Sequence, residues 1–328
     1  MINLFRTYNP LNIVWLAVLV LLLRLGYLFN APDKIPFIFV EHFARPLVPL
    51  NYEYYFSPFL NIMIAAVLVF LQALWFNQMV NSYSLLNKPS FLPALLYVVI
   101  SSLFTPFLVL SAPLICNFLV IGILYRLLGL YKSTDAKAAA FDLGMLIAIG
   151  TMIYLPFVYL FLIIWAGLVV FKPFNWREWV AAIIGFATVF FFLAVFYYLS
   201  DKLKVLSNIW LPLGTAFPSH IHINLYNYLV LIPVAIIAVL CAFQTSQIFF
   251  RSYVQTRKSF QLLLVMGVVT GLSFYVKSQF QLAHFVLCAV PFAVYFSYYF
   301  LYASRRWLYE GLFLLLVISI IYFQFNNF

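Results

Sequence analysis

Residues 11–30 read LNIVWLAVLVLLLRLGYLFN, an apolar run with Arg24 as its single charged side chain. A helix needs roughly 20 such residues to cross the hydrocarbon core of a membrane. The run follows a short polar leader that contains Arg6, as a secretory signal does, but it lacks a small-x-small cleavage site and ends in bulky side chains. We therefore expect an uncleaved first membrane span.

The rest of the chain has the same character. It contains 328 residues, of which 66% are hydrophobic and 8% charged, and a water-soluble domain of this length could not bury so much apolar surface. Its length allows about a dozen crossings and little else. We predict a single integral membrane domain over residues 1–328.

Apolar runs bounded by polar or Pro-containing breaks indicate eleven helices, and their boundaries are approximate. The stretch 142–171 is ambiguous, because Pro156 can separate two short helices or kink one long helix. We predict an all-α polytopic transmembrane helical bundle with about 11 spans, in a range of about 10–12. The helices are expected near 11–29, 57–79, 91–109, 112–130, 142–155, 157–171, 179–199, 226–247, 261–276, 283–302 and 308–325.

The basic residues predict the orientation. Cytoplasmic loops are enriched in Lys and Arg, and with the N-terminus inside, the 18 basic residues divide into 12 inner and 6 outer ones. This favours an inside N-terminus in a multi-pass protein of the inner membrane. The outer set is Arg24, Lys34, Arg45, Lys202, Lys204 and Lys277. The inner set is Arg6, Lys88, Arg126, Lys132, Lys137, Lys172, Arg177, Arg251, Arg257, Lys258, Arg305 and Arg306.

The two longest connectors, about 30–56 and 200–225, then both fall on the outer face. The first carries four prolines, too many for a continuous helix, and both connectors are too aromatic for free solvation. We expect them to lie along the outer membrane interface as short amphipathic pieces.

Several classes of function lack support in the sequence. The basic residues are scattered between apolar runs, so the net charge of +10 indicates membrane topology and predicts no nucleic-acid partner. The three cysteines lie inside apolar segments, so we expect neither a disulfide framework nor a metal site, and we predict no cofactor. The Walker, GxGxxG, HExxH, CxxC and GxSxG motifs are absent from the sequence.

Polar residues of the predicted outer face are the candidates for a functional site. The nonapeptide VKSQFQLAH, 276–284, places four of them between two predicted spans. The candidates are Asp33, Glu41, His42, Arg45 and Glu53 in the first connector, His220 and His222 in the second, and Lys277, Gln279, Gln281 and His284 in the nonapeptide.

These residues have alternative interpretations. Lys277 at the end of a span either anchors the helix at the headgroups or contacts a substrate. Glu41 is either solvated or, beside aromatic residues at a membrane surface, serves as a general base. His220 and His222 could face a metal, but no third ligand stands near them in the sequence. Arg24, about two turns before the end of its span, either snorkels outward or meets an anion.

Two stretches resemble the GT-C superfamily of polyprenyl-phosphate-sugar glycosyltransferases. LLLRLGYLFNAPDK, 21–34, is similar to the end of the first helix of that superfamily, where an Arg-Leu pair precedes a segment that bears a catalytic acid. KSQFQLAHFVLCAVPFAVYFSYYF, 277–300, is similar to its late helix, in which a polar lip precedes a Pro-containing apolar run. The isolated PDK of this chain departs from the usual Asp-Glu pair of the superfamily.

The resemblance implies transfer of a sugar from a polyprenyl-phosphate-linked donor at the outer face, with membrane lipid and this substrate as partners. Asp33 or Glu41 would be the catalytic acid that takes the proton of the acceptor, and Arg24 and Lys277 would lie near the lipid phosphate. The remaining expected substrate-binding residues are His42, Arg45, Gln279, Gln281 and His284.

The whole chain also resembles uncharacterised polytopic inner-membrane proteins of Bacteroidota. Two other functions therefore stand beside the glycosyltransferase, which in this chain is either active or degenerate. One is a non-enzymatic membrane subunit that scaffolds an envelope-assembly or secretion complex with other membrane proteins. The other is a transporter of a small or lipid-like solute, which would need a continuous polar path through the spans.

Overall fold

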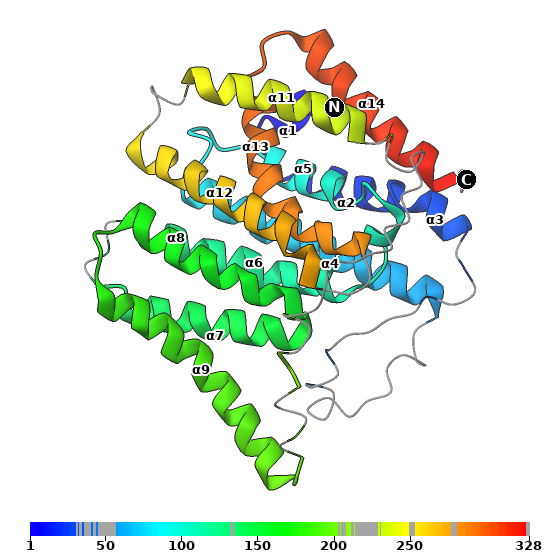
Figure 1. The fold of residues 1–328 in the computed structure, drawn as a ribbon. Helices are drawn as coiled ribbons and strands as arrows, with labels where there is room; N and C mark the ends of the chain where they lie inside the picture. The colour runs from blue at the N-terminus through cyan, green and yellow to red at the C-terminus, as the bar shows by residue number, and fades with distance from the viewer. Residues whose placement is uncertain are drawn as a thin grey trace.

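The computed structural model describes most of the chain, and helices are the regular secondary structure of the described part, with no strand there (Figure 1). The residues outside the description are 31, 33–34, 36–40, 42–43, 45–56, 132, 134, 203, 205–207, 211–212, 214–228, 230, 249–252, 277–280 and 326–328. The prediction of an all-α fold is confirmed for the described residues.

Each predicted helix corresponds to a helical segment. The α-helices are α1 (Ile2–Phe5), α2 (Asn12–Leu22), α3 (Leu25–Phe29), α4 (Pro58–Ser82), α5 (Leu92–Ile100), α6 (Ala112–Leu128), α7 (Lys137–Ile153), α8 (Phe161–Phe171), α9 (Trp176–Leu199), α11 (Leu231–Ile248), α12 (Val254–Leu272), α13 (Ala289–Tyr302) and α14 (Arg306–Phe325). Short 3-10 helices extend or join them: η3 (Thr105–Phe107), η4 (Leu155–Leu160), η8 (Ser273–Val276) and η9 (Leu282–Cys288).

Five helical segments of the described chain are long and apolar enough to cross a membrane: Pro58–Ser82, Trp176–Leu199, Val254–Val276, Leu282–Tyr302 and Arg306–Phe325. Four shorter apolar helices accompany them. Large apolar side chains such as Phe191, Phe192 and Leu314 point away from the bundle and are exposed. An apolar exterior around an apolar interior is the pattern of a membrane protein.

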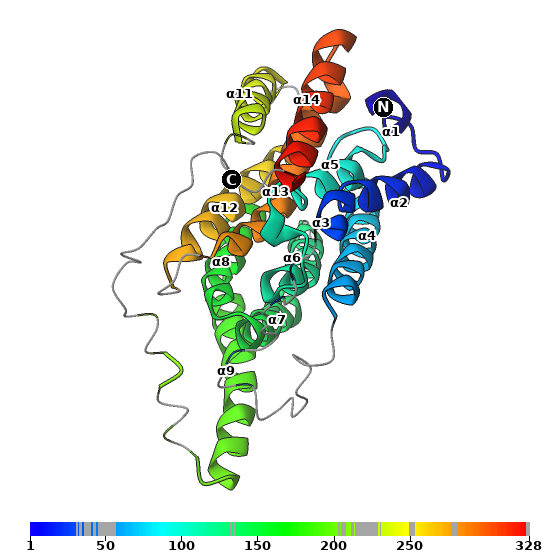
Figure 2. The same cartoon turned by 90° about the vertical axis from the view of Figure 1, so that its right-hand side faces the viewer.

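The helices alternate in direction, so the bundle has two ends (Figure 1). At the first end, α3, α7, α9, α12 and α14 finish and α4, α6, α11 and η9 begin. The connectors that the sequence places on the outer face join helices at this end, which we call the long-connector end. Figure 2 views the bundle from this side. At the opposite, short-connector end, α4 continues to α5, α6 to α7, α8 to α9, and α13 to α14.

Polar side chains link the helices around the buried helix α5. The Gln72 amide donates to the carbonyl of Leu114 at 2.7 Å, and the Tyr97 hydroxyl donates to the Gln72 side chain at 2.8 Å. The Asn117 amide nitrogen donates to Tyr97 and to the carbonyl of Val286, each at 3.0 Å. These bonds tie α4, α5, α6 and η9 together, and they are the interhelical hydrogen bonds expected of Asn and Gln in a membrane bundle.

The stretch 142–171 forms two helices. α7 ends at Ile153, Tyr154 is extended (φ −145°, ψ 109°), and η4 begins at Leu155 with Pro156 in its first turn. A proline is tolerated there because the first N–H groups of a helix have no partner within it. α7 begins at Lys137, five residues before the predicted boundary, since the Ala136 N–H donates to Glu178 and the Lys137 N–H to Asp135.

The backbones of α7 and α9 cross at two glycines. A Cβ atom added to Gly144 would lie 2.1 Å from the Ala182 carbonyl oxygen, and one added to Gly185 would lie 2.1 Å from the Phe141 carbonyl oxygen. Real side chains do not approach backbone atoms so closely, so only glycine permits this crossing. The crossing fixes the N-terminal half of α9 against the bundle.

Gly144→Ala is therefore expected to push α9 away from α7 and to lower the free energy of unfolding by about 3 kcal/mol or more. Gly311→Ala in α14 is the matched control, because a Cβ atom at Gly311 meets nothing within 4 Å. Thermal unfolding of both purified variants in one detergent measures the difference. Equal midpoints for the two variants would contradict the close crossing.

Candidate functional site

At the break between α7 and η4, backbone groups lack helical partners and polar side chains lie beside them, inside the long-connector end. Tyr154 lies at the break and is 3% exposed. A second break lies between α12 and α13, where the chain passes through η8 and η9. η4 and η8 pack against each other, so the two breaks are neighbours in space.

Tyr154 and His284 form a buried hydrogen-bonded pair across these breaks. The Tyr154 hydroxyl lies 2.9 Å from His284 Nδ1, and His284 Nε2 lies 2.8 Å from the Thr270 carbonyl oxygen. Because a carbonyl oxygen only accepts, Nε2 carries the ring proton, and Nδ1 accepts from the Tyr154 hydroxyl. The Thr270 carbonyl belongs to the last turn of α12, where carbonyls lack helical partners. The pair therefore links α7 to the end of α12.

Glu41 joins the first connector to the same break. Its N–H donates to the Met152 carbonyl at 3.2 Å, and its carboxylate accepts from the Leu155 N–H at 3.0 Å. Leu155 is the first residue of η4, so its N–H lacks an acceptor within that helix. A carboxylate is favoured at this position because the N-terminal end of a helix carries partial positive charge. Glu41 is thus held at the break by two hydrogen bonds.

An apolar cluster adjoins this arrangement and draws on five segments of the long-connector end. Its buried members are Ala44, Leu155, Leu193, Tyr197, Ile209 and Val276. They come from the first connector, η4, α9, the second connector and η8. We call this cluster, with Glu41, Tyr154 and His284, the junction. It brings together the three regions in which the sequence placed its candidate residues.

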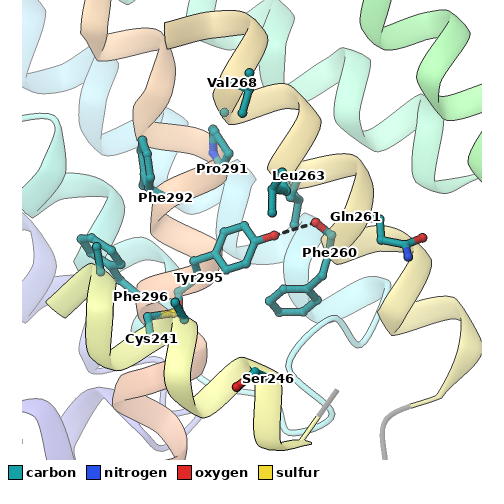
Figure 3. Close-up of a pocket in the computed structure, with 14 residues that line it drawn as sticks. Cys241, Ser246, Phe260, Gln261, Leu263, Val268, Pro291, Phe292, Tyr295 and Phe296 are labelled. Atoms are coloured by element: carbon teal, nitrogen blue, oxygen red, sulfur yellow. Dashed lines mark hydrogen bonds between the residues drawn. The ribbon is translucent and has the colours of Figure 1, made fainter. Parts of the chain in front are cut away.

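An apolar groove runs between α11, α12 and α13. It consists of two cavities of about 660 and 470 Å³ that share Ala238, Gly267, Phe292 and Phe296 as lining residues. Figure 3 shows the first cavity, where Tyr295 of α13 reaches the Phe260 carbonyl of α12 and Cys241 lies on the facing side of α11. The second cavity continues to Gly271 and η9. None of the lining residues is charged.

η9 separates the groove from the junction. A 3-10 helix has three residues per turn, so Leu282, Phe285 and Cys288 share one face. These three residues line the second cavity. His284 lies on a different face and bonds to Tyr154. These two turns of 3-10 helix therefore present apolar side chains to the groove and a histidine to the junction.

The structure brings together two of the predicted site residues. Glu41 and His284 both belong to the junction. Gln281 is exposed and is the N-cap residue of η9, where its carbonyl accepts from the His284 N–H at 3.0 Å. Asp33, His42, Arg45, Lys277 and Gln279 lie outside the described residues, as do Glu53, His220 and His222. Their roles stay predictions.

Arg24 does not snorkel. It is 0% exposed at the break between α2 and α3, and neither cavity of the groove is lined by it. Its Nη1 donates to the Val20 carbonyl at 3.3 Å, and Nε and Nη2 have no hydrogen-bond partner among the described residues. An isolated buried charge costs several kcal/mol. Its position favours the other expectation, contact with an anion.

Tyr154 of the junction, and Thr270 and Ser273, which bond to His284, are residues that the sequence did not indicate. Ser273 Oγ lies 3.2 Å from His284 Nε2 and donates to the Thr270 carbonyl at 3.1 Å. The sequence signal that could have indicated these residues was Pro156. A proline breaks a helix, and polar side chains near the break can bond to the backbone groups that it frees. Among the described residues, no group of His, Cys, Asp or Glu side chains is arranged to hold a metal ion.

Comparison with known proteins identifies the family. Residues 17–328 match the Family of unknown function (DUF6427), and the chain belongs to that family. No curated protein and no solved structure matches the chain.

The pair of Tyr154 and His284 is open to a direct test. Tyr154→Phe leaves the buried His284 Nδ1 without its donor, which is expected to cost about 1–3 kcal/mol of unfolding free energy. Tyr198→Phe is the matched control, because the Tyr198 side chain is 66% exposed and its change should be nearly neutral. Thermal unfolding in detergent compares them, and a Tyr154→Phe variant as stable as the control would contradict the pair.

Proposed function

We propose that this member of the family binds a polyprenyl-phosphate-linked sugar in the inner membrane and transfers the sugar at the outer face. The observation that carries the proposal is the groove that ends at η9, beside the junction with its carboxylate. The groove would hold the apolar chain of the donor, and the junction would lie at its headgroup.

The proposed topology has about 11 spans, an inside N-terminus and the long-connector end outside. Each predicted span has a helical counterpart, which supports the number. Most of the described basic residues lie at the short-connector end, among them Lys88, Lys137, Lys172 and Arg305, whereas Arg24, Lys202 and Lys204 lie at the other end. Cytoplasmic loops carry such an excess, which supports the orientation.

The length of the groove supports an isoprenoid chain. Along α11 its lining extends from Leu231 to Ser246, which is about 22 Å at the helical rise of 1.5 Å per residue. One leaflet contributes about 15 Å to the hydrocarbon core of about 30 Å. A phospholipid tail ends near the midplane, whereas a polyprenyl chain is long enough to fill the whole groove.

Two glycines of α12 support the groove as a binding site. Gly267 and Gly271 of α12 line the groove, and a Cβ atom at Gly271 would meet nothing within 4 Å. A glycine inside a helix costs about 1 kcal/mol relative to alanine, and packing does not require one at Gly271. The missing side chain leaves the space in which a hydrocarbon chain fits.

In the proposed reaction, a hydroxyl of the acceptor attacks the anomeric carbon of the donor sugar. The bond between that carbon and the phosphate oxygen breaks, and the polyprenyl phosphate leaves with the electron pair. Glu41 or Asp33 takes the proton of the hydroxyl. Lys277 follows η8 directly in the sequence, and its ammonium would neutralise the phosphate. Tyr154 and His284 would hold the break that positions Glu41.

Transport of a lipid-like solute is a second candidate. It is favoured by the continuation of the groove from η9 to Ser246, toward the short-connector end. A transferase needs the groove only as an anchor for the chain, whereas a transporter needs the headgroup to cross. Movement of a labelled lipid between the leaflets of proteoliposomes, without sugar transfer, would favour this candidate.

Gly271→Leu tests the occupant of the groove. A Cβ atom at this position meets nothing within 4 Å, and the position lines the second cavity. The protein should therefore keep its unfolding midpoint, while polyprenyl phosphate bound to the purified protein falls about tenfold or more, as native mass spectrometry measures. Gly311→Leu has equal open space in α14 and lies outside the groove, so it should bind as the wild type does.

Retention of polyprenyl phosphate by Gly271→Leu at the level of Gly311→Leu would contradict the groove as its site. Transfer itself is tested with Glu41→Gln in membranes supplied with a polyprenyl-phosphate-linked sugar. If Glu41 takes the proton, this variant should bind the donor and lose transfer to an acceptor, and if Asp33 takes it, Asp33→Asn should do so instead. Undiminished transfer by the double variant that carries both Glu41→Gln and Asp33→Asn would contradict the proposal that one of these two carboxylates takes the proton of the acceptor.

A further inference from the structure

The guanidinium of Arg24 presents one complete edge without partners. Nε and Nη2 are the two nitrogens without a hydrogen bond, while Nη1 donates to Val20. Nε–H and one N–H of Nη2 point in the same direction and form the fork that binds two oxygens of one carboxylate or phosphate. The unpaired donors are therefore a matched pair, arranged for a single oxyanion.

Arg24 lies at the level where α14 ends. The Gln324 amide nitrogen donates to the carbonyl of Leu23 at 2.5 Å, and Gln324 is the next-to-last residue of α14. α3 and α14 pack together at the long-connector end (Figure 1). The side chains on either side, Phe29 and Phe325, are exposed on the apolar exterior of the bundle. The fork is thus near the depth of lipid headgroups, beside a lipid-facing surface.

The described acids are engaged elsewhere. Glu178 pairs with Lys172 and Glu310 with the N-terminal ammonium, while Asp135 and Asp142 pair with Lys137 and Arg126. Glu41 binds the Leu155 N–H, and Asp201 is exposed after α9. None of these described carboxylates forms an ion pair with Arg24.

We infer that Arg24 binds the phosphate of an anionic lipid in a site between the α2–α3 break and α14. This site is separate from the groove, whose lining does not include Arg24. The two phosphate oxygens accept from Nε and Nη2, and the lipid tails lie along α3 and α14. The phosphate replaces the counterion that the buried guanidinium lacks, so the lipid stabilises the packing of α14 on α3.

The experiment uses the purified full chain in detergent, with phosphatidylglycerol, phosphatidylcholine or inorganic phosphate added. Phosphatidylglycerol should raise the wild-type unfolding midpoint and should be retained about tenfold more than phosphatidylcholine in native mass spectrometry. Arg24→Gln should lose both effects, and Arg24→Lys should keep only part of them, because an ammonium lacks the fork. Without lipid, Arg24→Gln should unfold no earlier than the wild type, since it removes an uncompensated charge.

Controls separate this site from the groove and from the acids outside the described residues. Gly271→Leu should keep the response to phosphatidylglycerol even though it loses polyprenyl phosphate. Stabilisation of the wild type by inorganic phosphate, lost in Arg24→Gln, would support the same phosphate site with a soluble source. The inference is overturned if Arg24→Gln keeps the preference for phosphatidylglycerol, if the wild type shows none, or if Arg24→Gln without lipid unfolds earlier than the wild type, as loss of an ion pair with Asp33 or Glu53 would cause.

Discussion

Backbone groups freed where a membrane helix breaks must find partners inside the protein, because hydrocarbon offers none. The structure meets this constraint at the α7–η4 break with Glu41 on the Leu155 N–H, and at the end of α12 with His284 on the Thr270 carbonyl. Tyr154 joins the two breaks through its bond to His284. The same bonds that satisfy the backbone therefore gather a carboxylate, a phenol and an imidazole at one end of the bundle.

η9 connects this polar end to the apolar groove. Its threefold periodicity turns Leu282, Phe285 and Cys288 to the groove and His284 to the junction. A chain that fills the groove therefore packs against the same short helix that holds the junction. Under the proposed function, occupation of the groove would bear on the position of Glu41 through η9 and Tyr154.

The sequence predicted the helices better than the site. Hydrophobic runs located the helical segments from α2 onward, and Pro156 marked 142–171 as either two helices or one kinked helix, because both signals are local in the chain. The Tyr154–His284 pair joins residues 130 positions apart, and nothing near Tyr154 in the sequence distinguishes it from the many other tyrosines. The glycine crossing of α7 and α9 was missed for the same reason, since Gly144 and Gly185 acquire their meaning only in contact. Glu41 and His284 were among the sequence candidates because an isolated polar residue among apolar ones is visible without a structure, and the structure places both at the junction.

The central claim is that the junction, and the end of the groove beside η9, face away from the cytoplasm. Single cysteines at the exposed positions Ser57, Lys202 and Gln281 of the long-connector end, and at Lys88 and Lys137 of the other end, test it in intact cells with a membrane-impermeant maleimide. Cys116, Cys241 and Cys288 are buried and give little background. The account predicts labelling at the first three positions in intact cells and at the last two only after permeabilisation. Protection of any of the first three in intact cells, with labelling after permeabilisation, would contradict it.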